Sequence, residues 1–175
     1  IANEIDAGIV KMQLIASQIA TDPFILNWAQ NGFNANDERF VIEKLKTSAK
    51  RNRLSSTSFA DKKTAKYWNQ DGFLRVLQDD SADGWFFAYS KSNSEYSVSI
   101  YDDPNTGKVD LFVNYQQVDG RGLSGTSRSF DDVVTMLSSF QIEESGFVYL
   151  VDTTGKVQLN SNSAIDETKT ISDIY

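Results

Sequence analysis

The first twenty residues carry apolar side chains at the spacing of an amphipathic α-helix. The apolar positions are Ile5, Ile9, Met12, Leu14, Ile15 and Ile19. No residue that suits an N-cap precedes them, so we expect the helix to continue upstream in a longer parent protein. Its apolar face either covers the domain's own sheet or pairs with a second copy. A homodimer through this helix is therefore one expectation.

Two further helices are predicted before residue 53. Thr21 or Asp22 caps the second helix, Pro23 suits its first turn, and Asn31-Gly32 ends it. Asp37 is the predicted cap of the third helix, which runs to about Lys50. The inward positions predicted for the third helix are Phe40, Val41, Leu45 and Ala49.

Strand-like segments dominate the rest of the chain. Residues 54–60 and 66–69 predict a hairpin, and Asp71-Gly72 predicts another turn. A short helix that carries Trp85, Phe86 and Tyr89 begins at Ser81 or Asp83. Antiparallel strands follow at residues 96–101, 109–116 and 123–128, the first two joined by a turn at 103–107. A helix from Phe130 to about Phe140 and a hairpin of residues 147–151 and 156–159 complete the prediction. This order of elements is typical of an α+β fold.

Composition excludes several classes of function. The 175 residues carry a net charge of −7, which argues against nucleic acid and anionic membrane surfaces as partners. Cysteine and histidine are both absent, so disulfides, thiolate nucleophiles, Cys/His zinc sites, His-ligated haem and Ser-His-Asp catalysis are excluded. No apolar run approaches the ~20 residues of a membrane span.

Acidic residues occur in adjacent pairs that could suggest catalysis. The pairs are at residues 79–80, 102–103, 131–132 and 143–144. Neighbouring carboxylates on turns and helix starts are usually solvated caps, whereas acid–base chemistry needs two carboxylates that face one cleft. The segment 102–105 lacks the glycine and distal glutamate of a calcium loop, and no phosphate-binding glycine motif is present. We therefore expect neither an enzyme nor a bound cofactor.

Three segments resemble the Cache domains, which are PAS-like extracytoplasmic sensors of bacterial receptors. The first joins YWNQDGFL at residues 67–74 to DGWFF at 83–87, and the second joins YDDPNTGK at 101–108 to LFVNY at 111–115. The third comprises GLSGTS at 122–127, FDD at 130–132 and SGFVYLVD at 145–152. The resemblance implies a long N-terminal helix and a central antiparallel sheet with flanking helices.

The same resemblance implies a division of the chain and a role for it. Residues 1–52 would form an N-terminal helical region, residues 53–140 the PAS-like sensor domain, and residues 141–175 a hairpin and tail that begin a second, truncated module. The parent would be a membrane-anchored histidine kinase, diguanylate cyclase or chemoreceptor, with this part in the periplasm. It would bind a small molecule and relay a conformational change through its helices. The alternative is the same fold without a ligand, acting as a protein-interaction or dimerisation module.

The resemblance also implies a pocket between the three-strand meander and the segment that crosses it. Trp85, Phe86 and Tyr101 match positions that line this pocket in the family. Members that bind amino acids carry an arginine where this chain has Asp83, and an acidic residue where it has Ser127. The usual clamps for an α-amino acid are therefore missing.

The residues themselves suggest further members of the pocket. Tyr115 offers a rigid wall with a polar edge, and Asn114 and Ser127 offer in-plane hydrogen bonds. Arg75 is the candidate for pairing with a carboxylate. For each of these side chains, and for Trp85, a purely structural role is the alternative.

Overall fold

Helices come first along the chain and strands follow. The computed structural model describes residues 2–103, 108–129, 132, 149–151 and 157–160. The helices are α1 (Ala2–Ala20), α2 (Pro23–Gln30), α3 (Ala35–Asn52) and α4 (Gly84–Lys91). The strands are β1 (Ser56–Asp61), β2 (Lys66–Asn69), β3 (Gly72–Val76), β4 (Tyr96–Asp103), β5 (Lys108–Gln116), β6 (Gly122–Ser129), β7 (Tyr149–Val151) and β8 (Val157–Asn160).

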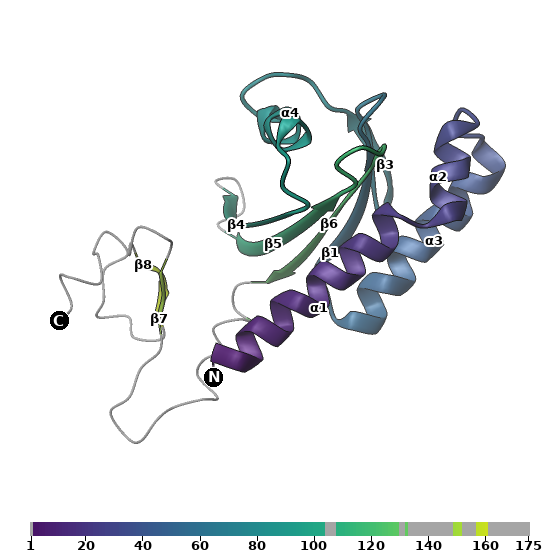
Figure 1. The fold of residues 1–175 in the computed structure, drawn as a ribbon. Helices are drawn as coiled ribbons and strands as arrows, with labels where there is room; N and C mark the ends of the chain where they lie inside the picture. Colours follow the sequence, from purple (N-terminus) through teal and green to yellow (C-terminus); the bar gives the residue numbers. More distant parts are fainter. Residues whose placement is uncertain (1, 104–107, 130–131, 133–148, 152–156, 161–175) are drawn as a thin grey trace.

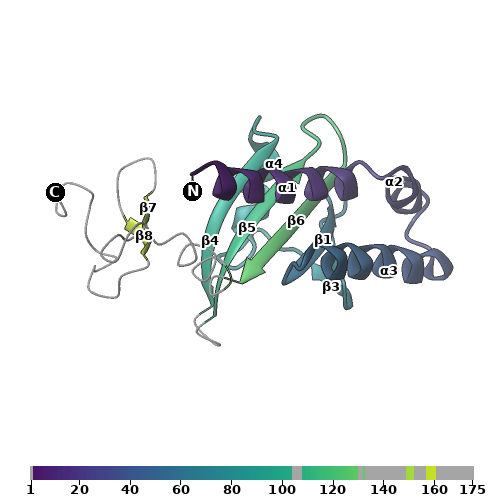
Figure 2. The same cartoon turned by 90° about the horizontal axis from the view of Figure 1, so that it is seen from below.

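Six of these strands form one antiparallel sheet in the order β3-β2-β1-β6-β5-β4, and β7 pairs with β8 separately. Helices α1, α2 and α3 cover one side of the large sheet, and α4 lies over the other (Figure 1). Figure 2 shows α1 and α3 on the same side, with α2 at one end. We call the two sides the helix face and the α4 face. The predicted α+β class and antiparallel sheet are confirmed.

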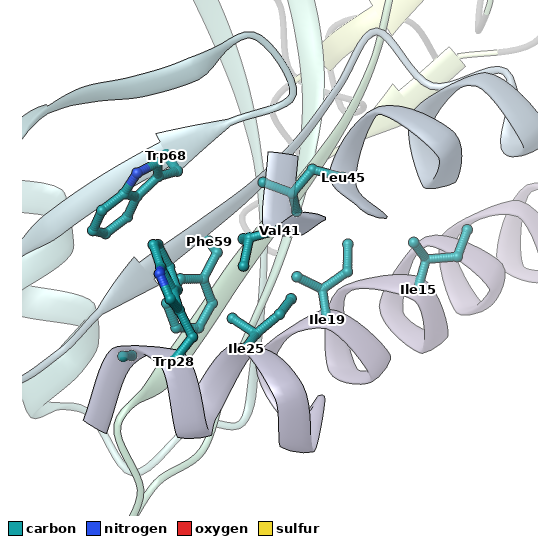
Figure 3. Close-up of a cluster of buried hydrophobic side chains, with 9 residues drawn as sticks. Ile15, Ile19, Ile25, Trp28, Val41, Leu45, Phe59 and Trp68 are labelled. Atoms are coloured by element: carbon teal, nitrogen blue, oxygen red, sulfur yellow. The ribbon is translucent and has the colours of Figure 1, made fainter. Parts of the chain in front are cut away.

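The helix face holds the main hydrophobic core (Figure 3). Phe59 of β1 and Trp68 of β2 point from the sheet toward Trp28 of α2 and Leu45 of α3. The rings of Trp28 and Trp68 meet edge to face with centroids 4.8 Å apart. Both indole N–H groups find acceptors, Asn34 O at 2.9 Å and Glu38 Oε1 at 2.6 Å, so these large rings are buried without an unpaired donor.

Capping decides where α2 and α3 begin. Of the two candidate caps for α2, the structure uses Asp22, whose Oδ1 accepts from the main-chain N of Phe24 at 2.9 Å. The predicted cap of α3 was wrong. Asn34 caps this helix by accepting from the main-chain N of Asp37 at 3.0 Å, so Asp37 lies inside the first turn. Its carboxylate instead accepts from the Asn34 amide at 2.8 Å.

Two predicted inward positions were also wrong. Leu14 is 56% exposed, because the next residue, Ile15, points toward the sheet and Leu14 therefore points away from it. Phe40 precedes the buried Val41 and points outward, where its ring meets Phe24 edge to face. In both cases the apolar pattern was broader than the stripe of helix that the sheet can cover.

The predictions of strands were more accurate than the predictions of which helix residues face the core. The hairpin β1–β2, the meander β4–β5–β6 and the pair β7–β8 are confirmed. The edge strand β3 was missed, since residues 72–76 lack alternation and most are exposed. The turn predicted at 103–107 and the helix predicted from Phe130 to Phe140 lie largely outside the described residues, and the boundary at residue 141 stays a prediction. Among the described helices, none is both long enough and apolar enough to cross a membrane.

Candidate functional site

The floor of the candidate site is the α4 face of the sheet. Residues paired across antiparallel strands point to the same side, so the register assigns each side chain to a face. Phe59 joins the core under α1–α3, whereas the next residue, Ala60, joins a cluster with Phe86 of α4. By this register the central α4 face carries mostly small and polar residues, together with Phe112, which lies between Ser99 and Ser127. The small and polar ones are Ser58, Ser97, Ser99, Asn114, Gly125 and Ser127.

Asn114 occupies the middle of this floor and is only 8% exposed. It lies opposite Gly125, and a Cβ added to Gly125 would lie 2.6 Å from Asn114 Oδ1. The missing side chain therefore gives the carboxamide room to lie across β6. Among the described residues, no side chain or main-chain group hydrogen-bonds to this carboxamide, although the main-chain O of Asn114 accepts from Tyr89.

Two serines flank this carboxamide on β1 and β6. Ser58 Oγ accepts from Gly125 N at 3.1 Å and donates to Gly125 O at 3.2 Å, which joins the two strands through a side chain. Ser127 is almost fully buried, and its Oγ lies 2.7 Å from Ser56 Oγ. Each hydroxyl has one donor and two acceptor positions, so the Ser56–Ser127 pair keeps hydrogen-bonding capacity for a further group.

Helix α4 closes over one corner of the floor. Phe86 is buried against Ala60, Leu77 and Leu123, and anchors the helix to the sheet. Trp85 remains 42% exposed, with its ring 6.5 Å from that of Tyr67. Of the two residues on this helix that were predicted to line the pocket, Trp85 is thus free to contact a ligand, whereas Phe86 is part of the core.

Arg75 belongs to the same corner, because it pairs with Tyr67 across β2 and β3. Its Nη2 and Nε donate to the two oxygens of Asp83, at 2.6 and 3.2 Å. Asp83 is buried and also accepts from the main-chain N of Gln78. The hydrogen bonds from Arg75 hold the pKa of Asp83 below its usual range, against the opposing effect of burial. The guanidinium therefore already has a carboxylate partner.

Tyr101 lies at the opposite corner of the α4 face, where its ring meets Phe112 edge to face at 6.3 Å. The register separates Tyr67 from Tyr101 by four strand spacings and six residues. In a flat sheet this corresponds to about 27 Å between their Cα atoms. No ring contact joins Trp85 to Tyr101 in the described structure. The two predicted walls thus belong to different ends of the floor.

Tyr115 follows Asn114 on β5 and so points to the helix face. Its Cα pairs with Tyr96, and the two rings lie 5.1 Å apart. Burial raises the pKa of Tyr115 above the usual value of a tyrosine. The structure therefore places Tyr115 apart from the other predicted site residues.

A polar network that the sequence did not reveal holds the end of α4 on the sheet. The buried Gln116 donates through Nε2 to Tyr89 O at 2.7 Å and to Ser94 O at 3.0 Å. Lys62 Nζ donates to Gln116 Oε1 at 2.9 Å, and also to the main-chain oxygens of Gln117 and Val118. Burial lowers the pKa of Lys62, while Asp119 opposes this effect. Only tertiary structure brings these groups together.

Tyr67 was also missed as a wall of the site. Pairing of the predicted β1–β2 hairpin could have placed it on the same face as Ser58, since both residues alternate away from the core. Metal chemistry finds no support in the part of the chain that the structure describes. Within that part, no three acidic side chains come together as a metal site.

No model of a known protein family matches the chain. Solved structures are similar over almost all of it. The ligand-binding domain of the amino acid chemoreceptor PctC of Pseudomonas aeruginosa, in complex with GABA, aligns with a TM-score of 0.65 at 15% identity, covering 99% of this chain and 76% of that one. The ligand-binding domain of the Pseudomonas fluorescens chemoreceptor CtaA, in complex with L-isoleucine, gives 0.68 at 16%, covering 99% and 69%.

The sensor domain of the histidine kinase DctB of V. cholerae gives a TM-score of 0.64 at 16% identity, covering 93% of this chain and 63% of that one. The fold is that of the Cache-type sensor domains. This confirms the fold that the three sequence segments implied. At these identities the likeness establishes the architecture, and the ligand has to be argued from the residues of this chain.

Proposed function

We propose that this Cache-type domain is the extracytoplasmic sensor region of a bacterial membrane receptor. It binds a small polar molecule between α4 and the α4 face of the sheet. The observation that carries the proposal is the Asn114 carboxamide, which is buried at the centre of the floor and has hydrogen-bonding capacity to spare. A ligand that hydrogen-bonds to this carboxamide exchanges a bond to water for a bond to the protein, which contributes about 0.5–1.5 kcal/mol for each bond.

The surroundings of Asn114 define the kind of ligand. Gly125 and the neighbouring serines keep the floor around the carboxamide free of large side chains, and Trp85 and Tyr67 supply an aromatic wall at its edge, where their rings meet edge to face. PctC and CtaA, which share the fold, were solved with GABA and L-isoleucine. In this chain Asp83 neutralises Arg75, and Ser127 carries no charge. We therefore expect a ligand other than an α-amino acid.

The relay begins at α4 and ends at α1. A ligand under α4 shifts that helix, and Gln116 and Lys62 connect its C-terminal end to the turn between β5 and β6. Gly122, at the end of this turn, lies so close to the last carbonyl of α1 that a Cβ there would overlap Ala20 O. The network is thus a contiguous route by which two arrangements of α4 become two positions of α1. The output module of the receptor lies outside this chain.

Thermal-shift screening tests the proposal. The panel contains GABA, L-isoleucine, L-serine, organic acids, amines and nucleobases, and calorimetry confirms each hit. A compound that raises the melting temperature of the unchanged protein should no longer raise that of Asn114→Leu. This substitution keeps the size of the side chain and removes its hydrogen bonds. The matched control is Ser124→Ala, which alters a buried hydroxyl on the helix face that makes no hydrogen bond within the described part of the chain. A panel that never shifts melting, or a hit that Asn114→Leu leaves unchanged, contradicts the proposal.

A protein-interaction or dimerisation module is the second candidate function. It is favoured by a specific observation, the exposed Val10 and Leu14 on α1. The apolar face that the sequence assigned to such pairing is not available, because Met12, Ile15 and Ile19 are buried in the domain's own core. Any pairing through α1 has to use the opposite side of the helix.

A further inference from the structure

A groove runs along the helix face between α1 and α3, and α2 lies across one end of it (Figure 2). Its volume is about 690 Å³, and sites that enclose small molecules measure roughly 300–1,000 Å³. The sheet separates this groove from the candidate ligand site, because α4 and the floor around Asn114 belong to the opposite face. We call it the helix groove.

The floor of the helix groove is apolar. Ile15 and Ile19 of α1 and Ile25 of α2 line it, and all three belong to the buried cluster of Figure 3. Phe24 and Phe40 extend the apolar lining at the α2 end, where their rings meet edge to face with centroids 6.5 Å apart. These rings are still 38% and 49% exposed, so they offer apolar surface to a bound molecule.

The charges at the α2 end do not favour an anion. Lys44 Nζ donates to Asp22 Oδ2 at 2.7 Å, so its charge is neutralised by a partner that also lines the groove. Asp37 accepts from the Asn34 amide at 2.8 Å and adds a carboxylate to this end. A negatively charged ligand group would be repelled by Asp37 and would have to compete with Asp22 for Lys44.

The opposite end of the helix groove has a different character. Thr47, Ser48 and Arg51 line it, all near the C-terminus of α3. In the described part of the chain, no carboxylate pairs with Arg51 and the Ser48 hydroxyl makes no hydrogen bond. Glu43 also lines the groove, but it lies about two turns before Arg51 and accepts from Thr47 at 3.4 Å. A guanidinium presents a planar fork of donors that matches a carboxylate, so this end suits an anion.

We propose that the helix groove binds an unbranched aliphatic carboxylate. Charge complementarity fixes its orientation, with the carboxylate on Arg51 and Ser48 and the chain over the isoleucine floor toward Phe24 and Phe40. The lining of α3 from Phe40 to Arg51 spans about 17 Å at the rise of an α-helix, so the groove suits a long, narrow molecule. Burial of the chain supplies the driving force, and Arg51 selects the sign of the charge.

This ligand contacts α1 and α3 at the same time. Ile15 and Ile19 belong to α1, whereas Ser48 and Arg51 belong to α3. A molecule that bridges two helices favours the arrangement of the helices to which it binds best. The helix groove is therefore a second input to α1, on the opposite side of the sheet from the ligand site under α4.

Calorimetry with decanoate tests the proposal. Three matched compounds, all used below the concentration at which they form micelles, separate the contributions of chain and charge. Decanol keeps the chain without the charge, decyltrimethylammonium reverses the charge, and acetate keeps the carboxylate without the chain. We expect decanoate to bind at a single site per chain, roughly tenfold or more tightly than each of the others. No binding of decanoate, or equal binding of decanoate and decyltrimethylammonium, would overturn the proposal.

Two substitutions on α3 locate the carboxylate. Arg51→Gln should weaken the binding of decanoate roughly tenfold, whereas Lys50→Gln should leave it unchanged. Both remove one cation from the last turn of α3 and so have the same effect on the helix dipole, but only Arg51 lines the groove. The melting temperature of each variant shows that it is folded.

Equal effects of these two substitutions would contradict the helix groove. Decanoate binding that is abolished by Asn114→Leu would place the compound under α4 and would also contradict it. The proposed sensing site is tested by its own panel of compounds, so the helix groove can fail while that site stands.

Discussion

Substitution of Gly125 by alanine tests how the floor of the site is built. The added Cβ would lie 2.6 Å from Asn114 Oδ1 and 3.0 Å from Ser58 Oγ. Both distances are shorter than ordinary carbon–oxygen contacts, and both neighbours are buried. Ser58 is held by two hydrogen bonds to Gly125 itself, so the short Asn114 side chain has to move. Overpacking of this kind costs about 1–3 kcal/mol.

The assay is urea denaturation followed by tryptophan fluorescence, with melting as a second measure. For a domain of this size the expected loss corresponds to a fall in melting temperature of roughly 2–12 °C. Gly84→Ala is the control, since no atom lies within 4 Å of its added Cβ and the position opens α4. There we expect no loss and a gain of up to about 1 kcal/mol, because alanine favours the helix.

The double variant Gly125→Ala with Asn114→Ala decides the mechanism. Removing the carboxamide frees the space that the new methyl group needs, so the two substitutions together should cost less than the sum of their separate costs. If Gly125→Ala is as stable as the unchanged protein, the close approach of Asn114 does not exist in solution. If the two costs simply add, Asn114 is not the group that the methyl group displaces.

Two further predictions concern the polar contacts around α4. Lys62→Met leaves three oxygen acceptors without their donor, which should cost about 1–3 kcal/mol of stability. It should also speed the hydrogen exchange of the main-chain amides in α4. If exchange in α4 rises no more than in the control Lys66→Met, the role given to Lys62 is wrong. Arg75 depresses the pKa of Asp83 in the folded protein, so this carboxylate contributes stability that is present above its unfolded pKa of about 3.9 and is lost as the pH falls through the lower folded value. The stability advantage over Asp83→Asn, followed by melting from pH 7 down to the acid range, should therefore be full near neutrality and shrink below about pH 4. An advantage that does not vary with pH would refute the ion pair.

Local pattern was sufficient for much of the architecture. The period of the apolar residues identified α1 and the meander, and Asp22 before Pro23 marked the start of α2. The same approach failed where two neighbouring apolar residues competed for one face, as at Leu14 beside Ile15. It also failed for β3, an edge strand that pairs on one side only and buries little. In these cases the neighbouring segment against which the residues pack decides which side chain is buried and whether a strand forms.

The sequence by itself determined the α+β class, the order of the described elements other than β3, and the absence of cysteine and histidine chemistry, because each depends on composition or on short-range periodicity. Only the tertiary structure decided which side chains meet. It placed Asn114 and Tyr115 on opposite faces of β5, separated Trp85 from Tyr101 across the sheet, and joined Arg75 to Asp83. These outcomes depend on strand order and register between segments far apart in the chain. No local periodicity encodes such pairings, because they are fixed only when all the strands have paired in register and both faces of the sheet are covered.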